Sequence, residues 1–334
     1  MIQMPVDARL LTAVLLLALL AMFVLVLNIG AVDIELGQAI GDAWRQETSI
    51  ESLILFDIRL PRALLAALVG ATLGLAGAAL QGLLRNPLAE PGIIGVSNGA
   101  ALGAVIVFYY GLAGFAWFML PLAGLLGALL AVLVIFLLVG QSRSTITLIL
   151  AGIAINAIGG ALIALALNFA ASPYAMQEIL FWLLGSVANR SFNEVHIALP
   201  FMLLGWGMML YCGRFLNALT LGEETASSLG FDVPRMRLVL ILGVAASVGA
   251  AVSVAGNIGF IGLVVPHLVR PLVAYEPRRL LLASGLAGAI LLLLADVAVQ
   301  SLSATTEMKL GVITALVGAP FFLLLILRSR NTLQ

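Results

Sequence analysis

The chain contains a series of apolar stretches of about 20 residues, separated by short polar links. As a helix, each stretch is long enough to cross a hydrocarbon core of roughly 30 Å. Hydrophobic residues make up 63% of the chain and charged residues 10%, whereas soluble domains carry about 25% charged residues. The sequence therefore excludes a soluble globular domain and predicts an all-α, polytopic membrane protein.

Hydropathy places ten spans in a single transmembrane domain over residues 1–334. Segment 30–58 carries six acidic residues and is expected outside the bilayer, while 172–194 is expected to form an interfacial helix. The apolar run after Arg9 is too long for a signal peptide, so it is expected to remain as the first span. The predicted spans are 10–29, 63–84, 92–111, 114–139, 146–170, 195–212, 238–256, 258–273, 280–299 and 311–327.

The basic residues indicate how these spans are oriented. If the N-terminus is cytoplasmic, 11 of the 16 lysine and arginine residues fall on the inner side. The positive-inside rule therefore predicts that both termini are cytoplasmic. The same orientation puts the loop 213–237 in the cytoplasm.

The most polar part of that loop, Leu221–Arg237, lies between two long apolar runs. Five of its 17 residues are charged, a far higher share than in the whole chain. A membrane protein has little reason to keep such a segment unless something soluble docks there. The charged residues are Glu223, Glu224, Asp232, Arg235 and Arg237.

Two glycine-rich stretches suggest an internal repeat. Val69–Ala78 aligns with Val248–Asn257 at five of ten positions. The spans that contain these stretches run in opposite directions in the predicted topology. An inverted repeat, which is common in transporters, would give that relation, and so would chance similarity between helices rich in small residues.

Glycine and proline also interrupt the eighth predicted span. Gly256, Gly259 and Gly262, followed by Pro266, weaken a helix in mid-membrane, because each glycine costs about 1 kcal/mol relative to alanine. Such an interruption marks a pathway or a hinge, or it allows close packing of helices.

The link Arg85–Gly92 joins the second and third spans and holds two prolines and a glycine. These residues end one helix and start the next in a fixed geometry. The link is therefore a tight turn. In addition, Asn86 and Leu88 would lie at the inner mouth of any central pathway.

Three charged residues are expected near the outer surface. Arg59 and Arg62 lie near one face of a helix start, where they either reach lipid phosphates or receive carboxylates of an external partner. Asp296 lies near the outer end of the ninth span, where it is either functional or makes a hydrogen bond at the helix end.

Several kinds of chemistry find no support in the sequence. His196 and His267 are the only histidines and Cys212 is the only cysteine, so no metal site or cofactor is expected. The only lysine, Lys309, is not part of a P-loop, so the chain has no ATP site of its own. No basic tract indicates nucleic acid. Energy for transport would therefore come from a partner, although an ion-driven secondary transporter and a membrane enzyme remain as alternatives.

The chain resembles the permease subunits of binding-protein-dependent ABC importers for iron-siderophores, haem and cobalamin, the FecCD type. The matching motifs run from the second span to the last, in the expected order. They are Arg59–Arg62 with Gln81–Gly99, Leu221–Gly230, Gly259–Arg270 and Gly311–Phe322.

This resemblance implies a type II ABC importer permease fold in the bacterial inner membrane. It implies a dimer, expected to be a homodimer surrounded by membrane lipid, with two ATPase subunits below and a substrate-binding protein outside. The expected substrate is, in order of preference, a ferric siderophore, haem or cobalamin.

The resemblance also assigns roles to individual residues. Arg59 and Arg62 would dock the binding protein. Asn86, Leu88, Ser144 and Thr145 would line the cytoplasmic gate. The contacts that couple the permease to the ATPase would be Glu223, Glu224, Ala226, Leu229 and Gly230. Two departures concern the outer face: relatives often have arginine near Gln300, and many have proline where Lys309 stands.

Overall fold

A computed structural model describes residues 7–30, 32–47, 49–139, 145–170, 172–302 and 308–330. These residues form helices joined by short links, and no strand occurs among them. The helices are α1 (Ala8–Asn28), α2 (Leu36–Trp44), α3 (Ile50–Leu53), η1 (Ile54–Arg59), α4 (Leu60–Leu84), η2 (Pro91–Ile94), α5 (Val96–Tyr109), η3 (Leu112–Gly114), α6 (Met119–Val139), α7 (Thr145–Asn168), α8 (Pro173–Leu183), α9 (Phe192–Tyr211), α10 (Gly213–Leu219), α11 (Glu223–Ser228), α12 (Val233–Ala255), α13 (Ile261–Val269), η4 (Arg270–Val273), α14 (Pro277–Leu302) and α15 (Leu310–Arg330).

Each of the ten predicted spans coincides with one of these helices, which confirms the all-α, polytopic fold. Seven described helices are long and apolar enough to cross a membrane. The apolar parts of the other three, in α5, α13 with η4, and α15, are shorter. The 14 residues of α5 extend only about 21 Å at a rise of 1.5 Å per residue.

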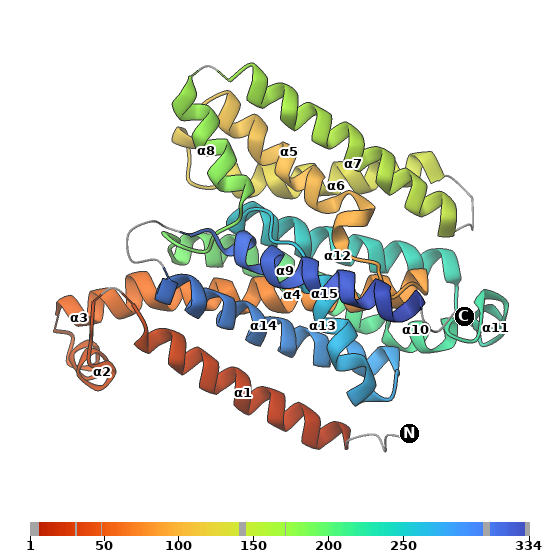
Figure 1. The fold of residues 1–334 in the computed structure, drawn as a ribbon, viewed down its shortest axis with the longest axis horizontal. Coiled ribbons are helices and arrows are strands. Elements are labelled where there is room, and N and C mark those ends of the chain that lie inside the picture. The colour runs from red at the N-terminus through yellow and green to blue at the C-terminus, as the bar shows by residue number, and fades with distance from the viewer. Residues whose placement is uncertain are drawn as a thin grey trace.

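The long helices lie side by side along one axis of the molecule (Figure 1). The start of α1, the end of α15 and the short helices α10 and α11 all lie at one end, while α2 and α3 lie at the other. Helices α4 and α12, which contain the two similar glycine-rich stretches, run in opposite directions. That orientation agrees with the predicted topology, and the inverted repeat itself stays a prediction.

The helix of the second span begins earlier than predicted, at Ile50 instead of residue 63. Ser49 and Ser52 form a capping box that starts it. The helix then widens into a π-helical segment, Ile54–Arg59, directly before Pro61. Proline has no N–H to donate and its ring crowds the carbonyl four residues earlier, and a π segment is one way for a helix to continue past such a site.

Helix α4 lies in the centre of the bundle and packs closely on α14 through small residues. A Cβ atom added at Gly74 would lie 2.1 Å from the Ser284 carbonyl oxygen, and one added at Gly70 would lie 2.3 Å from the Gly288 carbonyl oxygen. Small residues allow such backbone contact in membranes, where lipid provides no hydrophobic drive for helix association.

We predict that Gly74→Val destabilises the protein, because the added side chain meets a backbone carbonyl that cannot move alone. Overpacking of this kind costs about 1–3 kcal/mol or more. Gly207→Val is the matched control, since nothing lies within 4 Å of its Cβ position. The midpoint of thermal unfolding in detergent should fall for Gly74→Val only. Equal midpoints for the two variants would contradict this packing.

Candidate functional site

A non-helical link follows α4 and returns into the bundle. Arg85 takes a left-handed conformation (φ 48°) at the end of α4, and the Asn86 side chain accepts a hydrogen bond from the Leu88 N–H at 2.9 Å. Farther along the link, Pro91 lies close to Gly262. Gly262 in turn lies close to Gly77, which is on α4, seven residues before the end of that helix. The link therefore lies beside α4 as well as beyond its end.

A second break separates α12 from α13. Helix α12 ends at Gly256 (φ 73°), and α13 begins only after Phe260, which has the unusual φ of 67° for a residue with a side chain. Gly256 also allows a close contact, because a Cβ there would lie 2.2 Å from the Trp182 carbonyl oxygen. The predicted interruption thus combines a true break in the helix with close packing.

The two breaks meet at one cavity of about 540 Å³. Leu73, at the middle of α4, also lines it, so the cavity lies deep in the helical bundle. Non-helical backbone at membrane depth is tolerated where it lines a water-filled cavity or is buried in protein. The polar residues that line the cavity are Glu90, Ser97, Asn98, Asn156 and Asn257.

Asn156 on α7 bonds to η2 and α5 at one side of this cavity. Its Nδ2 donates to the Gly92 carbonyl, and Asn98 Nδ2 donates to the Asn156 carbonyl at 3.4 Å. The Asn156 Oδ1 atom is buried without a hydrogen-bond partner among the described residues. Such an atom requires an explanation, and a water molecule or a passing ligand would provide one.

Sequence reasoning missed Glu90, Asn98, Asn156 and Asn257 as a group. The available signal was Asn98 in the predicted span 92–111 and Asn156 near the middle of the predicted span 146–170, both among mostly apolar residues. That signal cannot show that the amides face each other.

Two of the predicted gate residues, Asn86 and Leu88, do not line this cavity. Asn86 and Leu88 are half-buried in the turn after α4. Ser144 lies outside the described residues, and Thr145 is described only as the first residue of α7. Ile149, one turn later on α7, does line the cavity. The gate role of all four residues stays a prediction.

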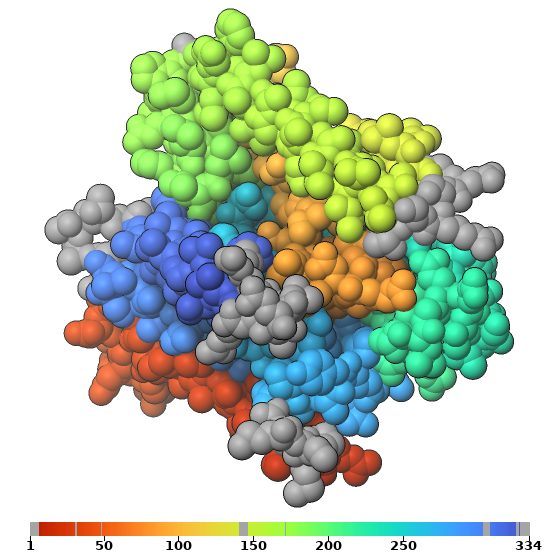
Figure 2. All heavy atoms as spheres, turned by 45° about the vertical axis from the view of Figure 1, so that its right-hand side comes forward, coloured from red at the N-terminus to blue at the C-terminus, as the bar shows by residue number. Residues whose placement is uncertain are grey.

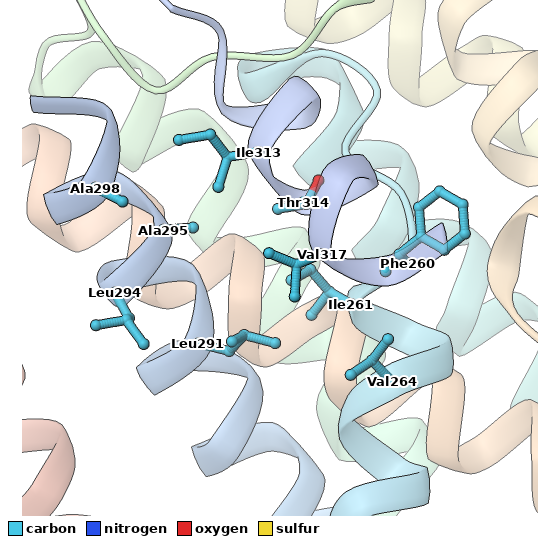
Figure 3. Close-up of a pocket in the computed structure, with 11 residues that line it drawn as sticks. Phe260, Ile261, Val264, Leu291, Leu294, Ala295, Ala298, Ile313, Thr314 and Val317 are labelled. Atoms are coloured by element: carbon cyan, nitrogen blue, oxygen red, sulfur yellow. The ribbon is translucent and has the colours of Figure 1, made fainter. Parts of the chain in front are cut away.

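A second, apolar cavity of about 220 Å³ lies between α13, α14 and α15 (Figure 3). Phe260 belongs to the lining of both cavities. Gly318 on α15 allows Phe260 to approach, because a Cβ at that position would lie 2.3 Å from Phe260 Cβ. Phe260, whose backbone is strained, therefore lies where the polar cavity and the apolar cavity adjoin.

The polar loop predicted to dock a partner forms two short helices, α10 and α11, which form a lobe at one edge of the surface (Figure 2). Glycines with positive φ bound α11 on both sides: Gly222 at 107° and Gly230 at 91°. Ala226 is fully buried beneath the lobe. Glu224 is exposed, and Leu229 is 61% exposed despite its apolar side chain.

Glu223 differs from Glu224 because it pairs within the chain. Its Oε1 atom lies 2.9 Å from Arg237 Nη2, and Arg237 is buried in the second turn of α12. Asp232 caps the same helix by accepting from the Arg235 N–H at 3.2 Å. The first acid of the lobe therefore fastens α11 to α12, and the second is available on the surface.

Both arginines predicted to dock an external partner also contact this chain. Arg59 is only 6% exposed and donates to the carbonyls of Leu27 and Val32. The Arg62 guanidinium forms a bidentate pair with Asp296, with Nη2–Oδ1 at 2.8 Å and Nε–Oδ2 at 3.0 Å. Their docking role stays a prediction.

Asp296 is fully buried and makes a third contact, with Gln300 Nε2 at 2.9 Å. Its contacts are therefore with Arg62 of α4 and with a residue four positions later on α14, and both possibilities for this acid stay predictions. Gln300, near which relatives often have an arginine, belongs to the same cluster of side chains.

A model of the FecCD transport family matches residues 16–328. The chain belongs to the FecCD transport family. This confirms the resemblance inferred from the motifs, and the FecCD chain is a multi-pass membrane permease.

Two relatives of this FecCD permease match it along nearly their whole length. It is 35% identical to the iron(3+)-hydroxamate import system permease protein FhuG of Bacillus subtilis, over 95% of this chain and 96% of that protein. It is 39% identical to the hemin transport system permease protein HmuU of Yersinia pestis, over 98% of each. A solved metal-chelate type ABC transporter in an inward-facing conformation is 32% identical, with a TM-score of 0.85 over 95% of this chain and 98% of that one.

Proposed function

We propose that this FecCD permease, as a single transmembrane domain, forms the pathway of an ATP-driven importer in the bacterial inner membrane. The substrate is a metal chelate or tetrapyrrole: a ferric siderophore, haem or cobalamin. The observation that supports this most directly is the polar cavity between two broken helices, because such breaks line substrate pathways in transporters.

The importer works as a homodimer with two separate ATPase subunits and an extracytoplasmic binding protein. Both termini and the α10–α11 lobe face the cytoplasm. Support for this arrangement comes from the excess of basic residues at that end and from the absence of a P-loop in the chain.

Helix α12 gives the lobe a direct connection to the pathway. It begins beside α11, where Arg237 pairs with Glu223 at 2.9 Å. Its 23 residues extend about 34 Å and end at Ala255, two residues before the cavity-lining residue Asn257. A displacement of the lobe by the ATPase would therefore reach the cavity through one rigid helix.

Transport in proteoliposomes tests the proposed function. The permease is reconstituted with its ATPase and binding protein, and uptake of a ferric hydroxamate, haemin and cyanocobalamin is measured with and without ATP. We expect uptake of at least one of them only with ATP, unaffected by ionophores. Uptake that needs an ion gradient and no ATPase would instead support a secondary transporter, for which Glu90 would be the ion-binding candidate in the cavity.

We predict that water reaches the cavity from outside the protein. A charged methanethiosulfonate reagent should modify Asn156→Cys at least tenfold faster than Ile158→Cys, whose wild-type side chain is 58% exposed on the outer surface of α7. The native thiol adds little background, because Cys212 is fully buried. Equal labelling rates at the two positions would exclude a water-accessible pathway at Asn156.

A further inference from the structure

A third cavity, of about 630 Å³, lies between the first turns of α1 and α14. It is at the same end of the molecule as the α10–α11 lobe. Its lining combines three arginines with apolar side chains. The charged lining residues are Arg9, Glu276, Arg278 and Arg279, and the larger apolar ones are Leu11, Leu16, Val273 and Leu282.

The charge of this groove is positive. Glu276 is the only acid in its lining, and its Oε2 atom pairs with Arg279. Its Oε1 atom accepts from Asn217 Nδ2 at 3.1 Å. Within the described part of the chain, neither Arg9 nor Arg278 pairs with a carboxylate, and the positive end of the α14 dipole lies beside them.

The order of the lining residues along the two helices matches the shape of a phospholipid. Arg9 is in the first turn of α1, and Arg278 and Arg279 are in the first turn of α14. Leu16 and Leu282 follow, deeper along the same helices. The groove is therefore cationic where a headgroup would lie and apolar toward the interior of the bilayer.

Helix α1 leaves room for lipid along this groove. Of its 21 residues only Leu11 and Val26 are buried, so most of its surface faces outward. A soluble anion would use the arginines alone and would gain nothing from the apolar wall below them.

We propose that this groove binds an anionic phospholipid, with the phosphate held by Arg9, Arg278 and Arg279 and an acyl chain along Leu16 and Leu282. Arginine suits this ligand because its planar guanidinium binds phosphate oxygens bidentately. Basic pockets between transmembrane helices on the cytoplasmic side bind anionic headgroups in the same way. The assignment to the inner leaflet rests on the proposed orientation, whereas the binding itself does not.

The bound lipid would also stabilise the position of α10 in the lobe. Asn217 on α10 accepts a hydrogen bond from the Arg278 N–H at 2.9 Å and donates to Glu276. Residues that bind the headgroup are therefore joined to α10 through one side chain. Occupancy of the groove orders the α14 end against which α10 packs.

Native mass spectrometry of the purified permease tests this proposal. The parent protein, mixed with equal amounts of phosphatidylglycerol and phosphatidylcholine, should retain phosphatidylglycerol preferentially. The variant Arg9→Gln, Arg278→Gln, Arg279→Gln should retain it at least tenfold less. The matched control removes three exposed arginines elsewhere, Arg45→Gln, Arg85→Gln, Arg214→Gln, and should retain it as the parent does.

Two further arms distinguish the possible ligands and guard against misfolding. Inorganic phosphate at millimolar concentration should leave lipid retention unchanged, and displacement by phosphate would overturn the acyl-chain part of the proposal. A photoreactive phosphatidylglycerol should crosslink to α1 or α14 in the unmodified parent. Crosslinking elsewhere only, or equal retention by both triple variants, would overturn the site. Neither result depends on ATP or substrate, so the transport function is judged separately.

Discussion

The double variant Glu224→Arg, Leu229→Asp should abolish ATP-dependent transport while the permease stays folded. Both side chains are exposed on the α10–α11 lobe, and neither Glu224 nor Leu229 supports the packing beneath it. An apolar side chain that is 61% exposed on the α10–α11 lobe fits a contact with a partner better than contact with water. Losing a central contact costs roughly 2 kcal/mol or more, about 30-fold in affinity.

The measurement is co-elution of the ATPase with the permease in size-exclusion chromatography, followed by uptake in proteoliposomes. Glu223→Gln is the informative comparison, since Glu223 pairs with buried Arg237 at 2.9 Å. The Glu223→Gln variant should have a lower unfolding midpoint than the parent, while the exposed side chains of the lobe stay unchanged. A double variant that still binds the ATPase in parental amounts and transports normally would place the docking surface elsewhere.

The second large effect is expected in the C-terminal part of α14. Asp296→Ala should lower the free energy of unfolding by about 3–5 kcal/mol, as is typical when one partner of a buried ion pair is removed. The Asp296 side chain is 1% exposed, and its partner Arg62 is 20% exposed. Without the carboxylate, the Arg62 guanidinium and the Gln300 amide both lose their acceptor. The unfolding midpoint in detergent reports this loss.

The companion variant Arg62→Leu, Asp296→Leu separates stability from docking. Replacing both partners by apolar residues should restore most of the stability, because a buried pair contributes little beyond an apolar equivalent. If Arg62 also receives a carboxylate of the binding protein, this stable variant should bind that protein at least tenfold more weakly in nanodiscs. Stability equal to the parent after Asp296→Ala alone would show that the pair is unimportant.

The hydrophobic pattern was enough to place a helix at each of the ten predicted spans, in the right order. It was also enough to locate the polar lobe and the break near Gly256, since both depend on residues that are close in sequence. The start of the second span was missed. The capping box at Ser49 and the π segment before Pro61 extend that helix through acidic positions that hydropathy assigns to a loop.

Pairings between distant residues could not be predicted in the same way. Arg62 and Asp296 are 234 residues apart, and nothing local to either one specifies the other. The same holds for Asn98 and Asn156, whose meeting depends on how α5 packs against α7. Single polar residues in apolar spans are a signal of function, but one sequence alone cannot show which of them share a cavity.

The short helices bear on how the protein is made. The 14 residues of α5 follow the polar link that contains Glu90, and the nine residues of α13 follow Asn257. Neither segment is long enough to leave the translocon alone as a stable span. By contrast, α1, with 21 mostly apolar residues, is long enough to do so. We therefore expect α5 and α13 to enter the bilayer as hairpins with α6 and α14, so that this permease would be inserted by pairs of helices.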